Sequence, residues 1–278
     1  MTSPLRSIKA EESVPMLHST SRQFARIVTR QQPEMVLLDT YRDMERLCAA
    51  VPPRSLALFD DRYSPPRSPR ILVNASPSAT PARYRRHRSS LLLLGPRYSS
   101  LHSAFRVARA GFRVRRDVRR VLIALGGGDT EGQLPRIVER VRSLLPEATL
   151  VVCGAPRVKI ATDSCLERKP WLSQVEIASE FARCDLAVLA GGQMLVQAAC
   201  IGVPAISFPQ TESQSKHAQA WRRIGSARVI RDCDRLPSAL RALGDMAARR
   251  EMSAAGRKTV DGLGAVRIAK AIVNAARN

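Results

Sequence analysis

Several residue types and patterns are scarce in this sequence of 278 residues. Aromatic residues make up 4% of it, which argues against a surface on which single-stranded bases stack. No apolar run approaches the ~20 residues that span a membrane, and the first residues contain no apolar segment typical of a secretory signal. We therefore expect no membrane span and a cytoplasmic location.

Metal-binding patterns are also missing. No pair among the six cysteines has C-x-x-C spacing, and the four histidines do not cluster with them. This excludes a typical zinc site and favours free, structural thiols in a reducing compartment. We expect neither a metal nor another cofactor.

Lysine is also scarce, because only six of the 45 basic residues are lysine and the rest are arginine. A net charge of +21 is typical of proteins that bind nucleic acids, but these arginines are scattered, which indicates a solvated surface. The densest cluster, residues 106–120, lies between two apolar segments and predicts an interdomain linker or an exposed helix. We expect a monomer whose partner is a small molecule and not a nucleic acid.

Short apolar runs alternate with helical patterns along the chain, which predicts βα units and parallel sheets. In the first half, an amphipathic helix at 21–32 precedes four strands. Ligands bind beyond the carboxyl ends of such strands, so polar residues that follow them belong to one rim. These are Asp39, Tyr41, Asp60, Asp61 and Asn74. The alternative is that Asp39 and Asp60 cap the helices that follow.

The pattern restarts at about residue 118 and forms a second α/β unit that runs to the end of the chain. We predict two Rossmann-like domains of the doubly wound type, the N-terminal one truncated, with a ligand cleft between them. The predicted division is a frayed segment at 1–20, a sugar-side domain at 21–112, a basic linker at 113–119 and a nucleotide-binding domain at 120–278.

Two glycine turns in the second half each join a strand to a helix. "LGGGDTEG" contains Gly126, Gly127, Gly128 and Asp129, and "LAGGQM" contains Gly191, Gly192, Gln193 and Met194. Glycines let a ligand approach the main chain, and the N-terminus of the following helix suits a phosphate group. Neither turn matches the P-loop or the dinucleotide fingerprint. A tight turn without a ligand remains the alternative.

These motifs resemble those of nucleotide-sugar enzymes with the glycosyltransferase B fold, which include lipid-II N-acetylglucosaminyltransferase. "GGGD" is similar to their GGS turn, and "AGGQMLVQAACIGVPAISFP" to their AGG motif. In the first half, "VLLDTY", "LALFDD" and "LLLLGPRYSSLHSAF" resemble the UDP-sugar hydrolases of the pseudaminic-acid pathway. That resemblance covers residues 34–230 and implies hydrolysis of a UDP-2,4-diacetamido-2,4,6-trideoxy sugar, with release of UDP.

The resemblance also implies roles for individual residues. The two glycine turns would hold the diphosphate and the sugar side, and Tyr41 would lie near the sugar. Gln197 stands where the family has a glutamate that binds the ribose, and Ser213 and Gln214 fall near its Asn-Gln pair. A neutral amide binds ribose hydroxyls more weakly than a carboxylate does.

The catalytic base is the main departure from that family. The family opens with G-x-G-H-x-x-R, whose histidine is the expected base, and this motif is absent from the sequence. The remaining catalytic candidates are Tyr41, His102 and His217, and each histidine is equally consistent with a structural role. Two further functions therefore remain open: a glycosyltransferase that uses a UDP-sugar donor, and a relative that binds the nucleotide-sugar without turnover.

Overall fold

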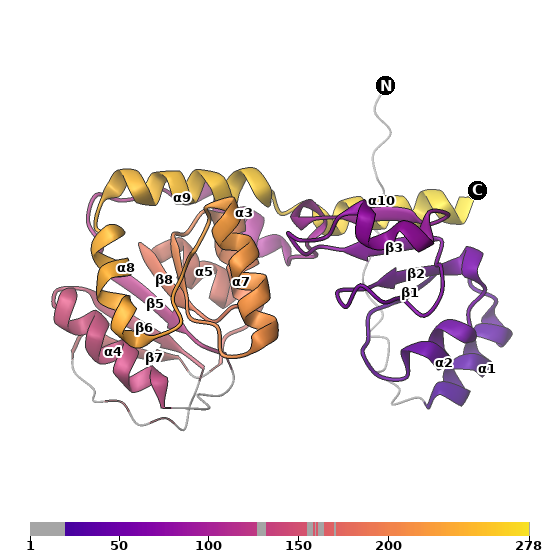
Figure 1. Ribbon diagram of the computed structural model, residues 1–278, viewed down its shortest axis with the longest axis horizontal. Coiled ribbons are helices and arrows are strands. Elements are labelled where there is room, and N and C mark those ends of the chain that lie inside the picture. Colours follow the sequence, from indigo (N-terminus) through magenta and orange to yellow (C-terminus); the bar gives the residue numbers. More distant parts are fainter. Residues whose placement is uncertain are drawn as a thin grey trace.

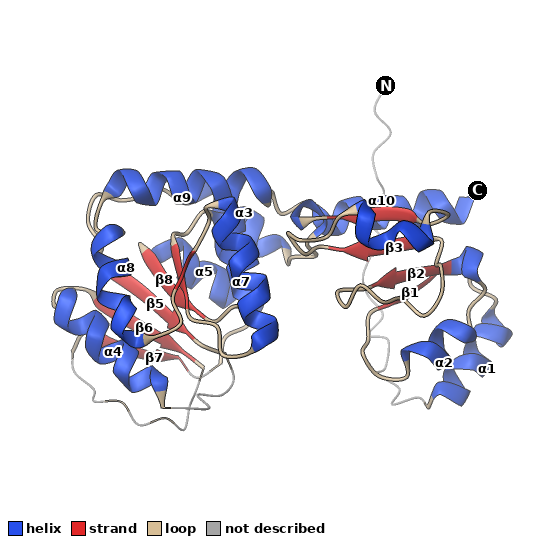
Figure 2. Cartoon of the chain, viewed as in Figure 1, coloured by secondary structure: helices blue, strands red, loops and turns tan. Residues whose placement is uncertain are grey.

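The strands of the computed structural model form two separate parallel sheets (Figures 1 and 2). The structure describes residues 20–126, 132–154, 158, 160, 164–169 and 171–277. One sheet has four strands and the other six, and every strand pairing in the described residues is parallel. The predicted α/β fold with two Rossmann-like parallel sheets is confirmed.

The four-stranded sheet has the strand order β1-β2-β3-β4. Its strands are β1 (Val36–Leu38), β2 (Leu56–Phe59), β3 (Ile71–Asn74) and β4 (Leu91–Leu94). Alternate residues point to opposite faces, so Leu56 and Leu58 pack with α1 (Ser21–Gln31) and α2 (Met44–Ala49), while Ala57 packs with α10 (Gly264–Arg277). Short 3₁₀ helices occur at Pro53–Ser55, Pro81–His87 and Pro96–Tyr98.

The six-stranded sheet has the order β10-β9-β8-β5-β6-β7. Its strands are β5 (Arg120–Ala124), β6 (Thr149–Cys153), β7 (Leu166–Lys169), β8 (Leu186–Leu189), β9 (Ala205–Ser207) and β10 (Arg228–Val229). Its helices are α4 (Gln133–Leu144), α5 (Gln174–Arg183), α6 (Gln193–Ile201), α7 (Glu212–Ile224), α8 (Leu236–Ala242) and α9 (Met246–Thr259), with a 3₁₀ turn at Cys233–Arg235. Neighbouring Leu122 and Ile123 lie in two different core clusters, so both faces of the sheet are covered.

Strand β7 was not predicted, because its sequence Leu-Glu-Arg-Lys has no apolar alternation. Ion pairs hold it at the edge of the sheet instead. The Arg120 guanidinium donates to both carboxylate oxygens of Glu167 at 2.7 Å, and to Glu180 at 3.0 Å. The ammonium of Lys169 donates to the other oxygen of Glu180. A polar edge strand of this kind carries no signal in a hydrophobic pattern.

Two helices bear on the predicted domain division. Helix α3 (Ser103–Gly111) lies before the predicted boundary at 112, yet its Phe105 is buried in the core of the six-stranded sheet. The C-terminal helix α10 returns to the four-stranded sheet, where Ile268 and Ala275 pack against its strands (Figure 1). The chain therefore crosses between the two sheets twice, and the division by residue number stays a prediction.

Arginine side chains in and near the arginine-rich segment 106–120 bind main-chain carbonyls of other helices. Nη1 of Arg109 donates to the carbonyl oxygens of Cys200 and Val260, at 2.7 and 3.0 Å. Arg257 donates in return to the carbonyl oxygen of Arg109 at 2.9 Å. Guanidinium groups here satisfy carbonyls at helix ends, which otherwise lack a partner. The expectation of a purely solvated arginine surface is therefore wrong for these side chains.

Cys48, Cys153, Cys184, Cys200 and Cys233 are free thiols, as predicted, and all five are buried. Burial raises the pKa of Cys153 to about 12, which keeps that thiol protonated at neutral pH. Among the described residues, no helix is both long and apolar enough to cross a membrane.

Candidate functional site

The carboxyl ends of four neighbouring strands form the first wall of the candidate site. These strands are β9, β8, β5 and β6, and because they are parallel their carboxyl ends share one edge of the sheet. Gly126 follows β5 and Gly191 follows β8, as predicted. The other residues of the first glycine turn, Gly127, Gly128 and Asp129, lie outside the described residues.

Gly154, at the end of β6, belongs to this edge and was missed in the sequence. It has a positive φ of 81°, and an added Cβ would lie 2.9 Å from the carbonyl oxygen of Gly126. The turn after β5 therefore packs directly on the turn after β6. The signal for it is the glycine in "VVCGAP", which follows a buried strand in the same way as the other two turns.

The paired glycines after β8 have different surroundings. A Cβ on Gly191 would lie 2.4 Å from the carbonyl oxygen of Gln214, so only glycine allows helix α7 to approach this turn. A Cβ on Gly192 would meet nothing within 4 Å. Gly192 therefore opens onto free space at the N-terminus of α6, where no side chain caps the helix. Gln193 and Met194 begin that helix, and main-chain N–H groups at such an end suit an anion.

The predicted ribose residue, Gln197, lies one turn further along α6 and is buried. Its amide nitrogen donates to Oε1 of Gln174 on α5, at 3.2 Å. This hydrogen bond joins α6 to α5. A carboxylate at position 197 could not make it, because an ionised carboxylate has no hydrogen to donate to Gln174 Oε1. Its ribose-binding role stays a prediction.

Ser213 and Gln214 lie in the first turn of α7. Ser213 is exposed. Oε1 of Gln214 accepts the main-chain N–H of Gln210 at 2.7 Å, and the hydroxyl of Thr211 caps the helix through the N–H of Gln214 at 3.2 Å. Gln214 therefore closes the loop between β9 and α7 next to Gly191.

Both ring nitrogens of His217 form hydrogen bonds, and one of these bonds holds the second glycine turn. Nδ1 lies 2.7 Å from the carbonyl oxygen of Gly191, and Nε1 of Trp221 lies 3.1 Å from Nε2. An indole N–H only donates, so Nε2 accepts and the proton is on Nδ1. Burial lowers the pKa of His217, while the bond to Gly191 and the charge of Asp61 oppose this. With both nitrogens occupied, His217 positions the turn and has no lone pair free for a base.

His102 also has a structural role. It is the N-cap of α3, where its Nδ1 accepts the N–H of Ala104 at 3.2 Å.

Two members of the predicted rim, Asn74 and Asp60, are structural as well. The amide of Asn74 donates to the hydroxyl of Tyr84 at 2.7 Å, and this hydroxyl donates to the main chain of Asp60 at 2.9 Å. Burial is the main cause that raises the pKa of Asp60.

Tyr41 and Asp61 form the second wall, at the carboxyl ends of β1 and β2. The hydroxyl of Tyr41 donates to Oδ2 of Asp61, and both residues are exposed. This hydrogen bond, with burial and the nearby carboxylates, raises the pKa of Tyr41 to about 12. The charge of Asp61 also acts on the pKa of His217, the residue that is bound to the turn at Gly191.

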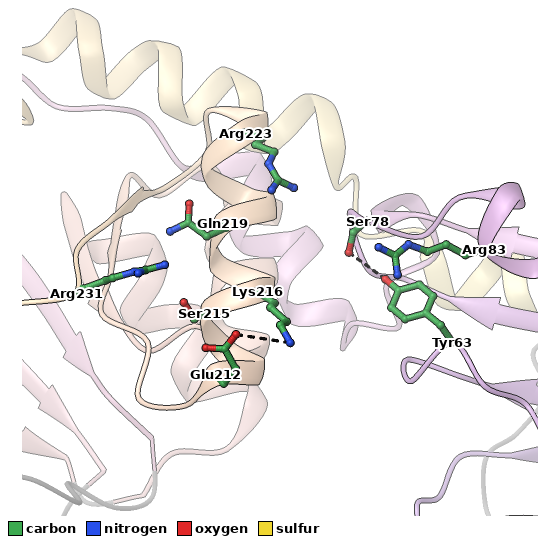
Figure 3. Close-up of a pocket in the computed structure, with 9 residues that line it drawn as sticks. All are labelled: Tyr63, Ser78, Arg83, Glu212, Ser215, Lys216, Gln219, Arg223 and Arg231. Carbon is green, nitrogen blue, oxygen red and sulfur yellow. Dashed lines mark hydrogen bonds and ion pairs between the residues drawn. The ribbon is translucent and has the colours of Figure 1, made fainter.

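A cleft of about 320 Å³ lies between the two sheets (Figure 3). From the four-stranded side it is lined by Tyr63, Ser78 and Arg83. From the six-stranded side it is lined by Glu212, Ser215, Lys216, Gln219 and Arg223 of α7, and by Arg231. The predicted cleft between the two units is therefore present in the described part of the chain, and its lining carries four cationic side chains and one carboxylate. Within that part, no group of three or more His, Cys, Asp or Glu side chains is arranged to hold a metal.

Comparison with known proteins supports the predicted resemblance. The chain is 29% identical over 188 residues to the spore coat polysaccharide biosynthesis protein SpsG of Bacillus subtilis (strain 168). This match covers 63% of the chain and 56% of SpsG, so the chain spans little more than half the length of that relative. No family model matches the chain.

Solved structures share the fold at low sequence identity. MurG of Acinetobacter baumannii has a TM-score of 0.64 and 14% identity, covering 91% of this chain and 77% of MurG. The S. aureus MnaA–UDP co-structure has a TM-score of 0.67 and 15% identity, covering 91% and 78%. The UDP-GlcNAc 2-epimerase of Neisseria meningitidis, bound to UDP-GlcNAc, has a TM-score of 0.66 and 7% identity, covering 91% and 80%. The chain has the glycosyltransferase B fold, and it is similar in sequence to SpsG.

Proposed function

We propose that this chain binds a UDP-sugar between its two sheets and hydrolyses it to UDP and the free sugar. The observation that carries the proposal is the arrangement of two walls. The six-stranded sheet contributes an uncapped helix N-terminus behind the open Gly192, and the four-stranded sheet contributes a tyrosine–carboxylate pair at the carboxyl ends of its strands. Two proteins of the same fold, MnaA and the N. meningitidis epimerase, were solved with UDP and with UDP-GlcNAc.

The glycine turns are suited to the diphosphate. Main-chain N–H groups at the start of α6 would donate to its oxygens, and the positive end of the helix dipole would stabilise its charge. In the hydrolysis, the bond between the anomeric carbon and the diphosphate oxygen breaks. The electron pair of that bond leaves with UDP, whose added charge these N–H groups would stabilise.

Asp61 is the proposed base. Its carboxylate would take a proton from the water that attacks the anomeric carbon, as general base catalysis requires. The hydroxyl of Tyr41 orients this carboxylate through their hydrogen bond and stays protonated, because its pKa is about 12. Asp61 thus takes the role that neither His102 nor His217 is free to perform. The sugar implied by the resemblance is 2,4-diacetamido-2,4,6-trideoxyaltrose.

The test is release of UDP from UDP-2,4-diacetamido-2,4,6-trideoxy-β-L-altropyranose, followed together with UDP binding by calorimetry. We expect Asp61→Asn to keep UDP binding and to lower the rate of release about 100-fold or more, the usual contribution of a general base. Asp43→Asn is the matched control, since Asp43 is an exposed carboxylate on the loop between β1 and α2 that also carries Tyr41. Equal activity of Asp61→Asn and Asp43→Asn would remove Asp61 from the mechanism.

Transfer to an acceptor is the second candidate function, and the cleft beside α7 is the observation that favours it. A transferase would release UDP only when an alcohol, amine or lipid acceptor is present. A relative that only binds would show UDP binding without release under either condition. The same two measurements therefore separate the three functions.

A further inference from the structure

The cleft between the two sheets has a strongly unbalanced charge. Four cationic side chains line it, from Arg83, Lys216, Arg223 and Arg231, against a single carboxylate, that of Glu212. Figure 3 shows Lys216 and Arg223 pointing toward the side of Arg83, with Arg231 reaching toward α7 from the opposite side. Cations from two sheets therefore converge on one space.

Most of this charge is not neutralised by a carboxylate among the residues that the structure describes. The Lys216 ammonium lies 3.6 Å from the Glu212 carboxylate, an exposed pair one helical turn apart. In the part of the chain that the structure describes, no carboxylate pairs with Arg83, Arg223 or Arg231. Arg83 instead lies over the ring of Tyr63, 4.5 Å from its centroid. The guanidinium groups of Arg109 and Arg120, by contrast, donate to main-chain carbonyls and to a carboxylate.

Polar groups of the kind that bind sugars lie among the cations. The hydroxyl of Tyr63 is 3.0 Å from the hydroxyl of Ser78, and the pair forms the wall on the four-stranded side. The hydroxyl of Ser215 and the amide of Gln219 line the opposite wall. A volume of about 320 Å³ accommodates a ligand the size of a monosaccharide with a charged substituent.

Helix α7 separates this cleft from the glycine turns. Gln214, His217 and Trp221 make up the face of α7 that holds Gly191. The cleft residues of α7 recur at Glu212, Lys216, Gln219 and Arg223, three or four positions apart, and so form another stripe. A ligand in the cleft would therefore lie against a different face of α7 from a ligand at the glycine turns.

From these features we infer that the cleft is a binding site for a second, anionic ligand: a sugar-sized molecule that carries a phosphate or a carboxylate. Arg223 and Arg231 bind the anionic group together with Lys216, while Arg83 closes over it from the other sheet. The hydroxyls of Tyr63, Ser78 and Ser215 bind the sugar hydroxyls. Such a ligand bridges the two sheets. This inference does not depend on hydrolysis of a UDP-sugar, because it concerns binding at another face of α7.

The experiment is calorimetric titration of the whole chain with glucose 6-phosphate, with glucuronate and with uncharged glucose. An ionic strength of about 0.15 M screens the diffuse attraction of a protein with net charge +21. We expect saturable binding of at least one of the two anions and none of glucose. Preference between the anions identifies the charged group as a phosphate or a carboxylate.

Variants locate the bound anion. We expect the double variant Arg223→Gln with Arg231→Gln to weaken binding about tenfold or more, because charge-assisted hydrogen bonds are lost. Arg83→Gln tests the contribution from the other sheet and should weaken binding as well. Arg222→Gln is the matched control, since Arg222 is an exposed arginine next to Arg223 that does not line the cleft. It should change the affinity less than twofold.

Four results would overturn the inference. If neither glucose 6-phosphate nor glucuronate bound saturably, the cleft would not be a site for a sugar-sized anion. An equal loss with Arg222→Gln would show a general effect of surface charge. Unchanged affinity in Arg83→Gln would confine the ligand to one sheet. If UDP displaced the anion, and the double variant lost affinity for UDP as much as for the anion, the cleft would be part of the nucleotide site. Thermal unfolding of each variant shows that it is folded, so none of these results can be confused with a failure of UDP release.

Discussion

Nδ1 of His217 lies 2.7 Å from the carbonyl oxygen of Gly191, and this hydrogen bond fixes α7 to the turn after β8. Trp221 donates to the other ring nitrogen from the next turn of the same helix. Gly191 has no side chain that could keep Gln214 away, so the main chains of the turn and of α7 come into contact. The position of Gly192, and of the helix end behind it, therefore depends on a neutral imidazole.

The first prediction concerns pH. The pKa of His217 is lowered from its ordinary 6.5, chiefly by burial, so the unfolded chain takes up this proton first as the pH falls. The stability contributed by neutral His217 is complete above pH 6.5 and is lost as the pH falls through the lower folded pKa. We expect the free energy of unfolding of His217→Gln, measured in urea, to depend less on pH than that of the wild type between about pH 7 and pH 5. Parallel curves would contradict the assignment of this titration to His217.

The second prediction separates the paired glycines. Gly191→Ala forces a Cβ against the main chain of Gln214 and should lower the free energy of unfolding by about 1–3 kcal/mol. Gly192→Ala meets no atom within 4 Å and should cost less than about 0.5 kcal/mol. It should nevertheless weaken UDP binding about tenfold, because its methyl group occupies the space where main chain and diphosphate would meet. Urea unfolding and calorimetry measure the two effects. Full UDP affinity in Gly192→Ala would place the diphosphate elsewhere.

The third prediction concerns Tyr41. Its hydroxyl donates to Asp61, so Tyr41→Phe leaves the carboxylate in place without its orienting bond. Hydrogen bonds to charged groups contribute about 1.5–3 kcal/mol, so we expect UDP release to slow about 10- to 100-fold, with UDP affinity unchanged. Steady-state kinetics should show this loss in kcat more than in KM. A loss confined to KM would instead make Tyr41 a substrate-binding residue.

The fourth prediction concerns Arg249, which is fully buried. Its guanidinium donates to the main-chain carbonyls of Arg115 and Arg116, at 2.8 and 2.5 Å. Arg249→Met keeps the volume but leaves two carbonyls without this partner, and should lower the free energy of unfolding by about 2–4 kcal/mol. Its exposed neighbour Arg250 supplies the control, because Arg250→Met should change the stability by less than about 0.5 kcal/mol. Similar values for the two variants would show that the buried bonds contribute little.

The sequence by itself determined the elements that depend on local apolar pattern and on glycine. Strands such as β5 and β8 are continuous apolar runs, and the glycines at 126 and 191 mark their ends, so the two parallel sheets and the edge where the turns gather were predictable. The same pattern gave no signal for β7, because Glu167 and Lys169 are held there by ion pairs with Arg120 and Glu180, which come from distant parts of the chain.

Only the tertiary structure decided what the side chains of the site do. His102 and His217 were equal candidates in the sequence, yet one caps a helix and the other has both ring nitrogens occupied. The pairing of Tyr41 with Asp61 joins two residues that lie 20 positions apart. The basic cleft assembles Arg83 with Arg223 and Arg231 from opposite sheets. Local propensity sets where a strand or helix forms. Contacts between residues far apart in the sequence depend on how those elements pack, and the local sequence pattern does not determine that packing.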